Sequence, residues 1–301
     1  MKRWFLFLIV LVLILSSCDV SETTSNVNND MSKTNEENVS SEVSKESDLT
    51  ISFSEQIVID DEKCTIKITK IEDDSIWGYT LKVFLENKSA DKKYMFSVDH
   101  ASINGLEIEP LFATEVESGK KANESLVLSL SELEEKEIGL ITDIDLKFRV
   151  YDSDDWMAED IALVSASVYP YGESKVEKYI REDKSTDTVI VNNDNIKVVV
   201  TDYTKDEIWG YTANLYIENK TDKELMFSAN DVSINGFMVD PLFATSVVAG
   251  KCEYASMTWF NNSLEENEIE EVSEIEFNFR VYDSNNWELN DLFAEKITLN
   301  P

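Results

Sequence analysis

The chain has 301 residues, 43% of them hydrophobic and 10% aromatic, and a formal net charge of -33 from 60 acidic and 27 basic residues. This composition supplies apolar side chains for folded cores and excludes a wholly disordered chain, and the length suggests about two domains. The acidity argues against a nucleic-acid-binding protein and against electrostatic adhesion to anionic lipid, because both surfaces attract clustered Lys and Arg. An acidic surface also keeps an exposed protein soluble.

The first residues have the organisation of a secretory leader. Lys2 and Arg3 precede an unbroken apolar run from Trp4 to Leu15, and "LSSC" ends the segment at Cys18. A basic start, a short apolar stretch and small residues before a cleavage point are typical of a signal peptide, and the run is too short for a lasting transmembrane helix. The ending resembles the bacterial lipobox, which implies cleavage after residues 1–17 and diacylation of Cys18. The alternative is an ordinary secreted protein with an incidental cysteine.

Residues 18–50 are expected to form a disordered, acidic and polar tether. This stretch is rich in Ser, Asn, Thr and Glu and contains no aromatic residue, so it cannot bury enough apolar surface to fold. It would hold the folded part of the chain away from the membrane.

The rest of the chain repeats itself. "SINGLEIEPLFAT" at 102–114 and "SINGFMVDPLFAT" at 233–245 are identical at nine of thirteen positions, and all four prolines and six of the eight glycines recur at an offset of 131 or 132 residues. Matched Gly and Pro imply matched turns, because these residues mark special backbone angles. We therefore predict a first domain at 51–170, a linker at 171–187 and a second domain at 188–301.

Within each copy, apolar and polar residues alternate, as in "IDLKFRVY" at 144–151 and "IEFNFRVY" at 275–282. This period of two is typical of strands with one face in a core, and Asn-Gly between apolar flanks predicts a type I′ hairpin. Short helical turns are expected at 131–138 and 262–269, with capping boxes starting at Ser131 and Asn262. Further strands are predicted at 56–60, 64–71, 79–87, 93–97, 124–130 and 160–168, with partners at 188–192, 196–203, 211–219, 224–228, 254–260 and 292–299.

Many short strands separated by frequent turns predict an all-β fold of two tandem immunoglobulin-like antiparallel β-sandwich domains. The lipobox, the polar tether and the repeated "GY…ENK…FS…SING…FRVYD" pattern resemble Gram-positive lipoproteins with uncharacterised Ig-like domains, a group similar in fold to the immunoprotective extracellular protein of mycobacteria. The resemblance covers about residues 55–301 and implies a location on the outside of a cell with a single membrane. It brings no catalytic residues and no cofactor.

Catalytic signals are weak. The single histidine, His100, has no nucleophile motif beside it, and its counterpart in the second copy is Asp231. Paired acids are so abundant that no pair indicates a glycosidase. We expect no enzymatic activity, no cofactor and a surface or strand-edge histidine.

Three further features leave alternatives open. The Asp152–Asp155 cluster in "YDSDDW" predicts a plain turn, with a calcium site as the alternative. Cys64 and Cys252 occupy unmatched positions, so they are either unpaired thiols or an inter-domain disulfide. The Asn-x-Ser/Thr sequences at Asn87 and Asn219 carry no functional weight in a bacterial chain.

The "IWGY" motif, which recurs at 76–79 and 208–211, is the most suggestive candidate for binding. Trp77, Tyr79, Trp209 and Tyr211 are candidate ligand contacts, since loop Trp and Tyr stack on sugars and anchor protein partners. The alternative is a core tryptophan beside a glycine that relieves a bulge.

These features together predict a lipoprotein anchored by Cys18 at the outer face of the cytoplasmic membrane. Its expected role is a non-catalytic binding or adhesion module for a cell-surface protein or glycan, with no nucleic-acid partner and no metal. The alternative is a structural or envelope-accessory spacer.

Overall fold

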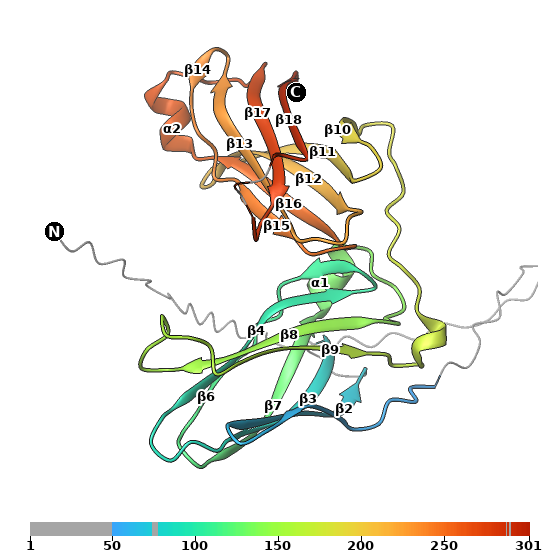
Figure 1. The fold of residues 1–301 in the computed structure, drawn as a ribbon. Coiled ribbons are helices and arrows are strands. Elements are labelled where there is room, and N and C mark those ends of the chain that lie inside the picture. Colours follow the sequence, from blue (N-terminus) through green and yellow to red (C-terminus); the bar gives the residue numbers. More distant parts are fainter. Residues whose placement is uncertain (1–49, 74–77, 287, 289) are drawn as a thin grey trace, which may run out of the picture. The chain divides into compact units, whose positions relative to one another are not determined.

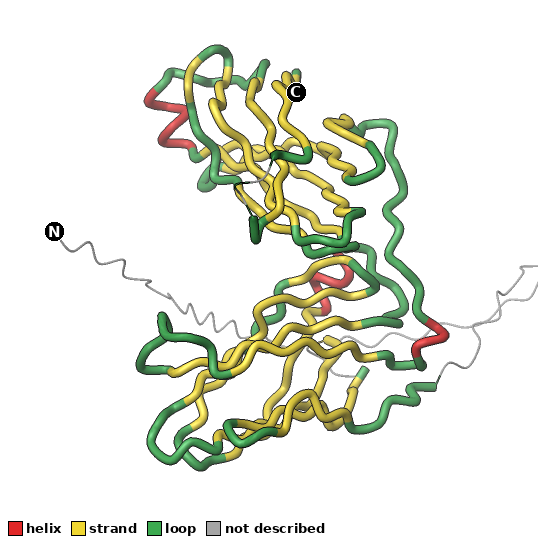
Figure 2. Tube along the Cα trace, viewed as in Figure 1, coloured by secondary structure: helices red, strands yellow, loops and turns green. Residues whose placement is uncertain are grey.

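A computed structural model describes residues 50–301 except 74–77, 287 and 289 (Figure 1). Strands make up most of this part of the chain, and the helices are short (Figure 2). The sheets are built from antiparallel pairs within each repeat, so the predicted all-β sandwich class is confirmed. Among the described residues, no helix has the length and apolar character needed to cross a bilayer.

We call residues 51–170 the N-terminal repeat. One of its sheets has the strand order β1-β2-β3-β7, and the other has the order β5-β4-β8-β9, with β6 paired to β4. Figure 1 shows β4, β8 and β9 in one layer and β7, β3 and β2 in the other. The elements are β1 (Gln56–Asp60), β2 (Cys64–Glu72), β3 (Gly78–Asn87), β4 (Tyr94–Ile103), β5 (Leu106–Ile108), β6 (Ala113–Val116), β7 (Lys121–Ser129), α1 (Leu130–Glu135), β8 (Ile144–Asp152) and β9 (Ala162–Val168).

The C-terminal repeat, residues 188–301, has the same topology. Its strands have the orders β10-β11-β12-β16 and β14-β13-β17-β18, with β15 paired to β13. Because β16 also pairs with β5, the strands β10-β11-β12-β16 and β5-β4-β8-β9, together with β6, form one nine-stranded sheet that runs through both repeats. Bulges recur too: the shift between Ile68 and Lys70 matches that between Val200 and Asp202. The elements are β10 (Thr188–Asn192), β11 (Ile196–Asp206), β12 (Gly210–Asn219), β13 (Leu225–Ile234), β14 (Phe237–Met238), β15 (Ala244–Val247), β16 (Cys252–Trp259), α2 (Asn261–Glu266), β17 (Ile275–Asp283) and β18 (Phe293–Leu299).

Each repeat has its own apolar core. The inward-facing residues of β8, Ile144, Leu146, Phe148 and Val150, are at most 2% exposed, as the alternating pattern predicts. The two main core clusters draw on residues 64–168 and 191–299, with partly buried residues from 51 onward. Asp48–Pro301 therefore contains both cores and their strand pairings in one compact unit.

The predicted hairpins are present in both repeats. Asn104 and Gly105 have φ of 52° and 88°, and Asn235 and Gly236 have φ of 51° and 84°. Positive φ at both central residues defines the type I′ turn that Asn-Gly favours. Both Asn side chains also accept backbone N–H groups from the segment before the following long strand, including the N–H of Asp143 at 3.1 Å.

The short helices are confirmed, but their predicted caps are wrong. α1 begins at Leu130 and its cap residue is Ser129, whereas α2 begins at Asn261 after Phe260. Neither cap residue makes a side-chain hydrogen bond to the helix. Ser131 therefore lies within the first turn of α1, where it cannot serve as the predicted cap.

The two repeats meet along one strand edge. β5 pairs with β16 in parallel at Leu106 and Cys252, and the Cys252 N–H donates to the Gly105 carbonyl at 3.0 Å. Between the repeats, a 3-10 turn (Glu173–Lys175) begins the connecting segment. Arg181 on this segment forms two 2.7 Å hydrogen bonds to the Asp187 carboxylate. That bidentate pair lowers the pKa of Asp187 to about 2, with Arg181 as the main cause.

Candidate functional site

The "IWGY" segment at 208–211 leads into β12, and the described part of the first segment, Gly78 and Tyr79, begins the matching strand β3. Tyr79 is buried, Tyr211 is half-buried and Trp209 is 64% exposed, while Trp77 lies outside the described residues. The alternative interpretation, a tryptophan in the core, is therefore wrong for Trp209. Its position in the turn before β12 puts it beyond the alternating part of the strand.

The glycine of this motif permits a close backbone approach. Gly78 and Gly210 have φ of 124° and 106°, and a Cβ at either position would lie 2.1 Å from the carbonyl oxygen of Leu128 or Trp259. Any side chain there would collide with backbone, and L residues rarely adopt such angles. The glycine thus fixes where the turn ends and the strand begins.

Ile208 and Trp209, which we call the apolar tip, are the most exposed part of the C-terminal "IWGY" segment. Their exposed fractions are 78% and 64%. The Asp206 carboxylate accepts the N–H groups of Ile208 at 2.7 Å and Trp209 at 2.8 Å, and these two bonds lower its pKa. The Asn261 amide donates to the Glu207 carbonyl at 2.7 Å. The turn backbone is thereby held while its two apolar side chains face solvent.

Aromatic rings support the strands beneath the tip. Tyr203 stacks on Tyr211 with 5.9 Å between ring centroids, and Tyr211 packs against Trp259 at 6.4 Å. Trp259 is fully buried and donates its indole N–H to the Val239 carbonyl at 3.0 Å. A preformed turn on a packed base loses less conformational entropy when a partner docks.

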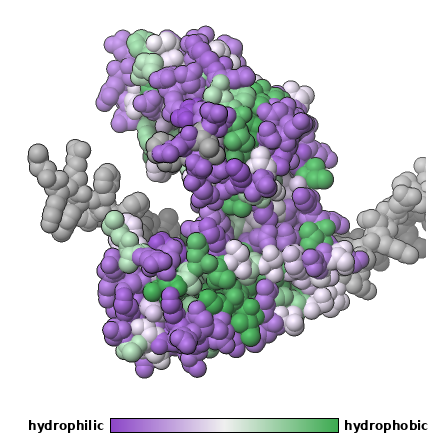
Figure 3. Space-filling view, in the orientation of Figure 1, coloured by the Kyte–Doolittle hydropathy of each residue, from purple (hydrophilic) through white to green (hydrophobic). Residues whose placement is uncertain are grey.

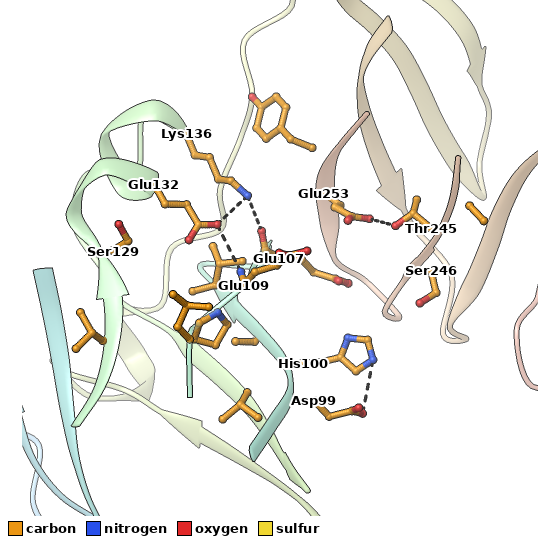
Figure 4. Close-up of a pocket in the computed structure, with 18 of the residues that line it drawn as sticks. Asp99, His100, Glu107, Glu109, Ser129, Glu132, Lys136, Thr245, Ser246 and Glu253 are labelled. Carbon is orange, nitrogen blue, oxygen red and sulfur yellow. Dashed lines mark hydrogen bonds and ion pairs between the residues drawn. The ribbon is translucent and has the colours of Figure 1, made fainter. Parts of the chain in front are cut away.

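A pocket of about 1180 Å³ is the second candidate (Figure 4). It lies where β4, β5 and α1 face β15 and β16. Its lining is rich in carboxylates, and Figure 4 shows Glu132 and Glu107 beside the amine of Lys136, with Glu253 and Asp99 farther from it. Lys136 Nζ lies 3.1 Å from Glu132 and donates to the Glu107 carbonyl at 3.3 Å. The labelled lining residues are Asp99, His100, Glu107, Glu109, Ser129, Glu132, Lys136, Thr245, Ser246 and Glu253.

Two carboxyl groups in this pocket hold protons more tightly than usual. Burial raises the pKa of Glu107 to about 7 and that of Glu253 to about 6. Glu107 accepts the Val248 N–H at 2.6 Å, and Glu253 accepts the Thr245 hydroxyl at 2.8 Å. The pocket therefore gains negative charge between about pH 6 and 7, and at higher pH it favours cationic groups.

His100 also lines this pocket, at the bulge between Val98 and His100 in the β4–β8 pair. Its Nε2 lies 3.8 Å from the carboxylate of its neighbour Asp99, which Lys147 also contacts at 3.1 Å. It is a half-buried residue of β4, which pairs with β5 on one side and β8 on the other, so it does not lie at the edge of the sheet.

The Asp152–Asp155 cluster forms a turn. The Asp152 carboxylate receives the Lys92 amine at 2.8 Å and the Asp154 N–H at 3.1 Å. Asp283 in the second copy has the matching lysine contact, with Lys223 at 3.0 Å. These contacts use the carboxylate oxygens that the calcium alternative would need, and no group of three or more metal-ligating side chains occurs among the described residues.

The cysteines do not pair. Cys64 and Cys252 are both buried free thiols, and burial raises the pKa of each to about 11. Cys64 lies in the core of the N-terminal repeat, whereas Cys252 packs with Leu106 and Tyr216 at the β5–β16 junction. The inter-domain disulfide that the sequence left open is therefore wrong. Cys18 lies outside the described residues.

Two buried asparagines have roles that the sequence analysis missed. Asn87 is 0% exposed and Asn219 is 1% exposed. The Asn219 amide donates to the carbonyls of Lys223 at 2.7 Å and Val247 at 2.8 Å, and its oxygen accepts the Thr221 N–H at 3.0 Å. Asn87 makes the matching bonds in its own repeat. The recurrence of "ENK" in both copies was the signal for this clamp.

Comparisons with known proteins give little. No family model and no curated protein matches the chain. Among solved structures, the YadV chaperone is 10% identical with a TM-score of 0.25, covering 79% of this chain and 100% of that one. Red sea bream transglutaminase is 9% identical with a TM-score of 0.20, covering 74% of this chain. This chain spans 28% of the length of the transglutaminase.

Proposed function

We propose that this chain is a lipoprotein, anchored through Cys18 at the outer face of the cytoplasmic membrane, and that its two repeats form a non-catalytic binding module. The partner is a cell-surface protein or glycan. This assignment extends the likeness of the sequence to Gram-positive lipoproteins with Ig-like domains.

The observation that carries the proposal is the exposed Trp209. A large aromatic ring at 64% exposure, on a turn held by Asp206 and Asn261, gives contact area without needing to be ordered first. Much of the surface in view is hydrophilic, with apolar residues gathered in limited patches (Figure 3). Tryptophan is among the residue types that most often anchor protein interfaces.

The alternative is a spacer, in which the repeats only set a distance from the membrane. The β5–β16 pairing favours it, because it ties the repeats to each other, and the Tyr179–Tyr254 hydroxyl contact at 2.8 Å also holds the connecting segment against the C-terminal repeat. A spacer needs no exposed anchor, so the side chain of Trp209 separates the two functions.

The test uses the segment 48–301, which contains both cores, immobilised and exposed to peptidoglycan fragments and solubilised surface proteins. Trp209→Ala is compared with Trp156→Ala, since both tryptophans are 64% exposed. We expect Trp209→Ala to reduce retention of one fraction at least tenfold and Trp156→Ala to leave it unchanged. Equal retention by the two variants, or no retention by the parent segment, would contradict the binding proposal and favour the spacer.

A further inference from the structure

The two repeats of one chain join head to tail. β5, the second strand of the Asn-Gly hairpin in the N-terminal repeat, lies beside β16 of the C-terminal repeat, and the Cys252 N–H donates to the Gly105 carbonyl at 3.0 Å. Leu106 is fully buried in this junction, against Tyr216 and Cys252. The contact joins unlike surfaces, which we call the hairpin face (around β5) and the receiving edge (β16). Because the repeats share one topology, each of them contains a version of both surfaces.

The hairpin face of the C-terminal repeat is exposed. The counterparts of Gly105 and Leu106 are Gly236 and Phe237, which lead into and begin β14. Phe237 is 49% exposed and Met238 is 66% exposed, whereas Leu106 is 0% exposed. Among the described residues, no backbone N–H donates to the Gly236 carbonyl. β14 therefore presents to solvent the same two features that join the repeats at β5, an apolar side chain and a free acceptor.

The receiving edge of the N-terminal repeat is open as well. β7 corresponds to β16 and is the last strand in the order β1-β2-β3-β7. Lys121 stands at the position of Cys252. The Asn87 N–H donates to the Lys120 carbonyl at 3.0 Å, so the backbone groups of Lys120 face β3. Because successive residues of a strand direct these groups to opposite sides, the Lys121 N–H faces the open edge, as the Cys252 N–H does in β16.

Phe84 supplies an apolar surface beside this edge. It stands at the position of Tyr216, which belongs to the buried cluster of the junction. The Phe84 ring is half-buried, and the amines of Lys67 and Lys121 each lie 5.9 Å from its centroid. A second aromatic ring placed against this group would gain apolar contact and a cation–π interaction. The exposed Phe237 of another copy has the required chemistry.

Charge favours the same pairing. In the junction, the Lys251 amine contacts the Asp145 carboxylate. Their counterparts are Lys120, which is exposed on the receiving edge, and Glu276, so both signs of charge are kept. Glu276 contacts only an exposed lysine, Lys296, at 2.9 Å, among the ion pairs of the described residues. Lysine on an edge opposes pairing with most strands, so a partner that brings a carboxylate to it is selected.

We propose that copies of this chain associate head to tail, with β14 of one copy parallel to β7 of the next. The Gly236 carbonyl of one copy accepts the Lys121 N–H of the other. Phe237 covers Phe84. Two copies leave one surface of each kind unused, so larger rings or filaments form. The association belongs to the segment 48–301 and uses neither the lipid anchor nor the apolar tip, so it stands or fails separately from the proposed function.

The experiment measures sedimentation velocity of the segment 48–301 from about 10 µM to about 1 mM, the range in which weak interfaces are populated. We expect species larger than dimers at the upper end. Phe237→Asp blocks the hairpin face. Lys121→Pro blocks the receiving edge, because proline removes the N–H at the open edge and is tolerated on edge strands. Each variant alone should associate at least tenfold more weakly, whereas Ile180→Asp, a control at an 82% exposed residue of the connecting segment, should behave as the parent does.

A mixture of the two blocked variants tests the geometry. Each variant keeps one intact surface, so Phe237→Asp and Lys121→Pro chains should together form a dimer and nothing larger. Melting curves check that both are folded. Reversed charges give a second test that leaves the β7 backbone unchanged: Lys120→Glu should weaken association, and mixing it with Glu276→Lys should restore association.

Three results would overturn the proposal. The first is a parent segment that stays monomeric at 1 mM, including the case in which Phe237→Asp instead abolishes retention of a different surface protein. The second is a mixture of folded blocked variants that forms no dimer or forms larger species. The third is association that neither Phe237→Asp nor Lys120→Glu changes.

Discussion

The buried asparagine clamp makes the sharpest prediction about stability. Asn219→Ala removes the amide that donates to the Lys223 and Val247 carbonyls and the oxygen that accepts the Thr221 N–H. Because Asn219 is 1% exposed, water cannot replace these bonds without opening the structure. Three hydrogen bonds to backbone groups are lost at about 1 kcal/mol each, so the free energy of unfolding should fall by about 3 kcal/mol.

Urea unfolding of the segment 48–301, followed by circular dichroism and tryptophan fluorescence, measures this loss. Asn193→Ala is the matched control: its side chain also accepts two N–H groups, from Asn195 and Ile196 at 2.9 Å, but in an exposed turn. Water can satisfy those donors, so we expect a loss of about 1 kcal/mol or less. A cost for Asn219→Ala that equals the cost for Asn193→Ala would refute the argument from burial.

Three other predictions follow from the same structure. Burial raises the pKa of Glu107 to about 7 in the folded chain, so this group contributes most to stability below about pH 4.5 and progressively less as the pH rises to 7. In urea unfolding midpoints measured from pH 4.5 to 7.5, Glu107→Gln should reduce that decline in stability. An unchanged dependence of the midpoint on pH would contradict this prediction. Gly210→Ala should lower the free energy of unfolding by about 2 kcal/mol or more, because the new Cβ would lie 2.1 Å from the Trp259 carbonyl oxygen. A melting temperature equal to that of the parent would show that the backbone moves apart at little cost. Cys18→Ser should abolish labelling of the chain by radioactive palmitate in a Gram-positive host, whereas continued labelling would place the acyl group elsewhere.

Alternation and turn chemistry located most strands. β1 and β10 begin and end at the predicted residues, and β8 extends one residue beyond its predicted end. The short strands β6 and β15 were missed. They are four residues each and pair with only one strand, so they carry too few alternating positions to register as a pattern.

Features that arise from contacts between residues far apart in the chain were harder to predict from the sequence. Trp209 is exposed because it lies at the tip of a turn. The hydrophobic character of its side chain was equally compatible with a position in the core. The β5–β16 pairing joins elements that have no such contact in their own repeats, so internal repetition gave no hint of it.

The β5–β16 junction accounts for a difference in side-chain character between two equivalent strand edges. β16 is the last strand that the C-terminal repeat contributes to the nine-stranded sheet, and β5 pairs with it at Cys252, two residues before the half-buried Tyr254. The corresponding positions on β7 are the exposed Lys121 and Asn123. Open edges invite pairing with other chains, and lysine discourages it. Cleavage between the repeats would therefore expose the β16 edge of the C-terminal piece to pairing with other chains. In the intact chain, the N-terminal repeat protects that edge from aggregation by pairing with part of it.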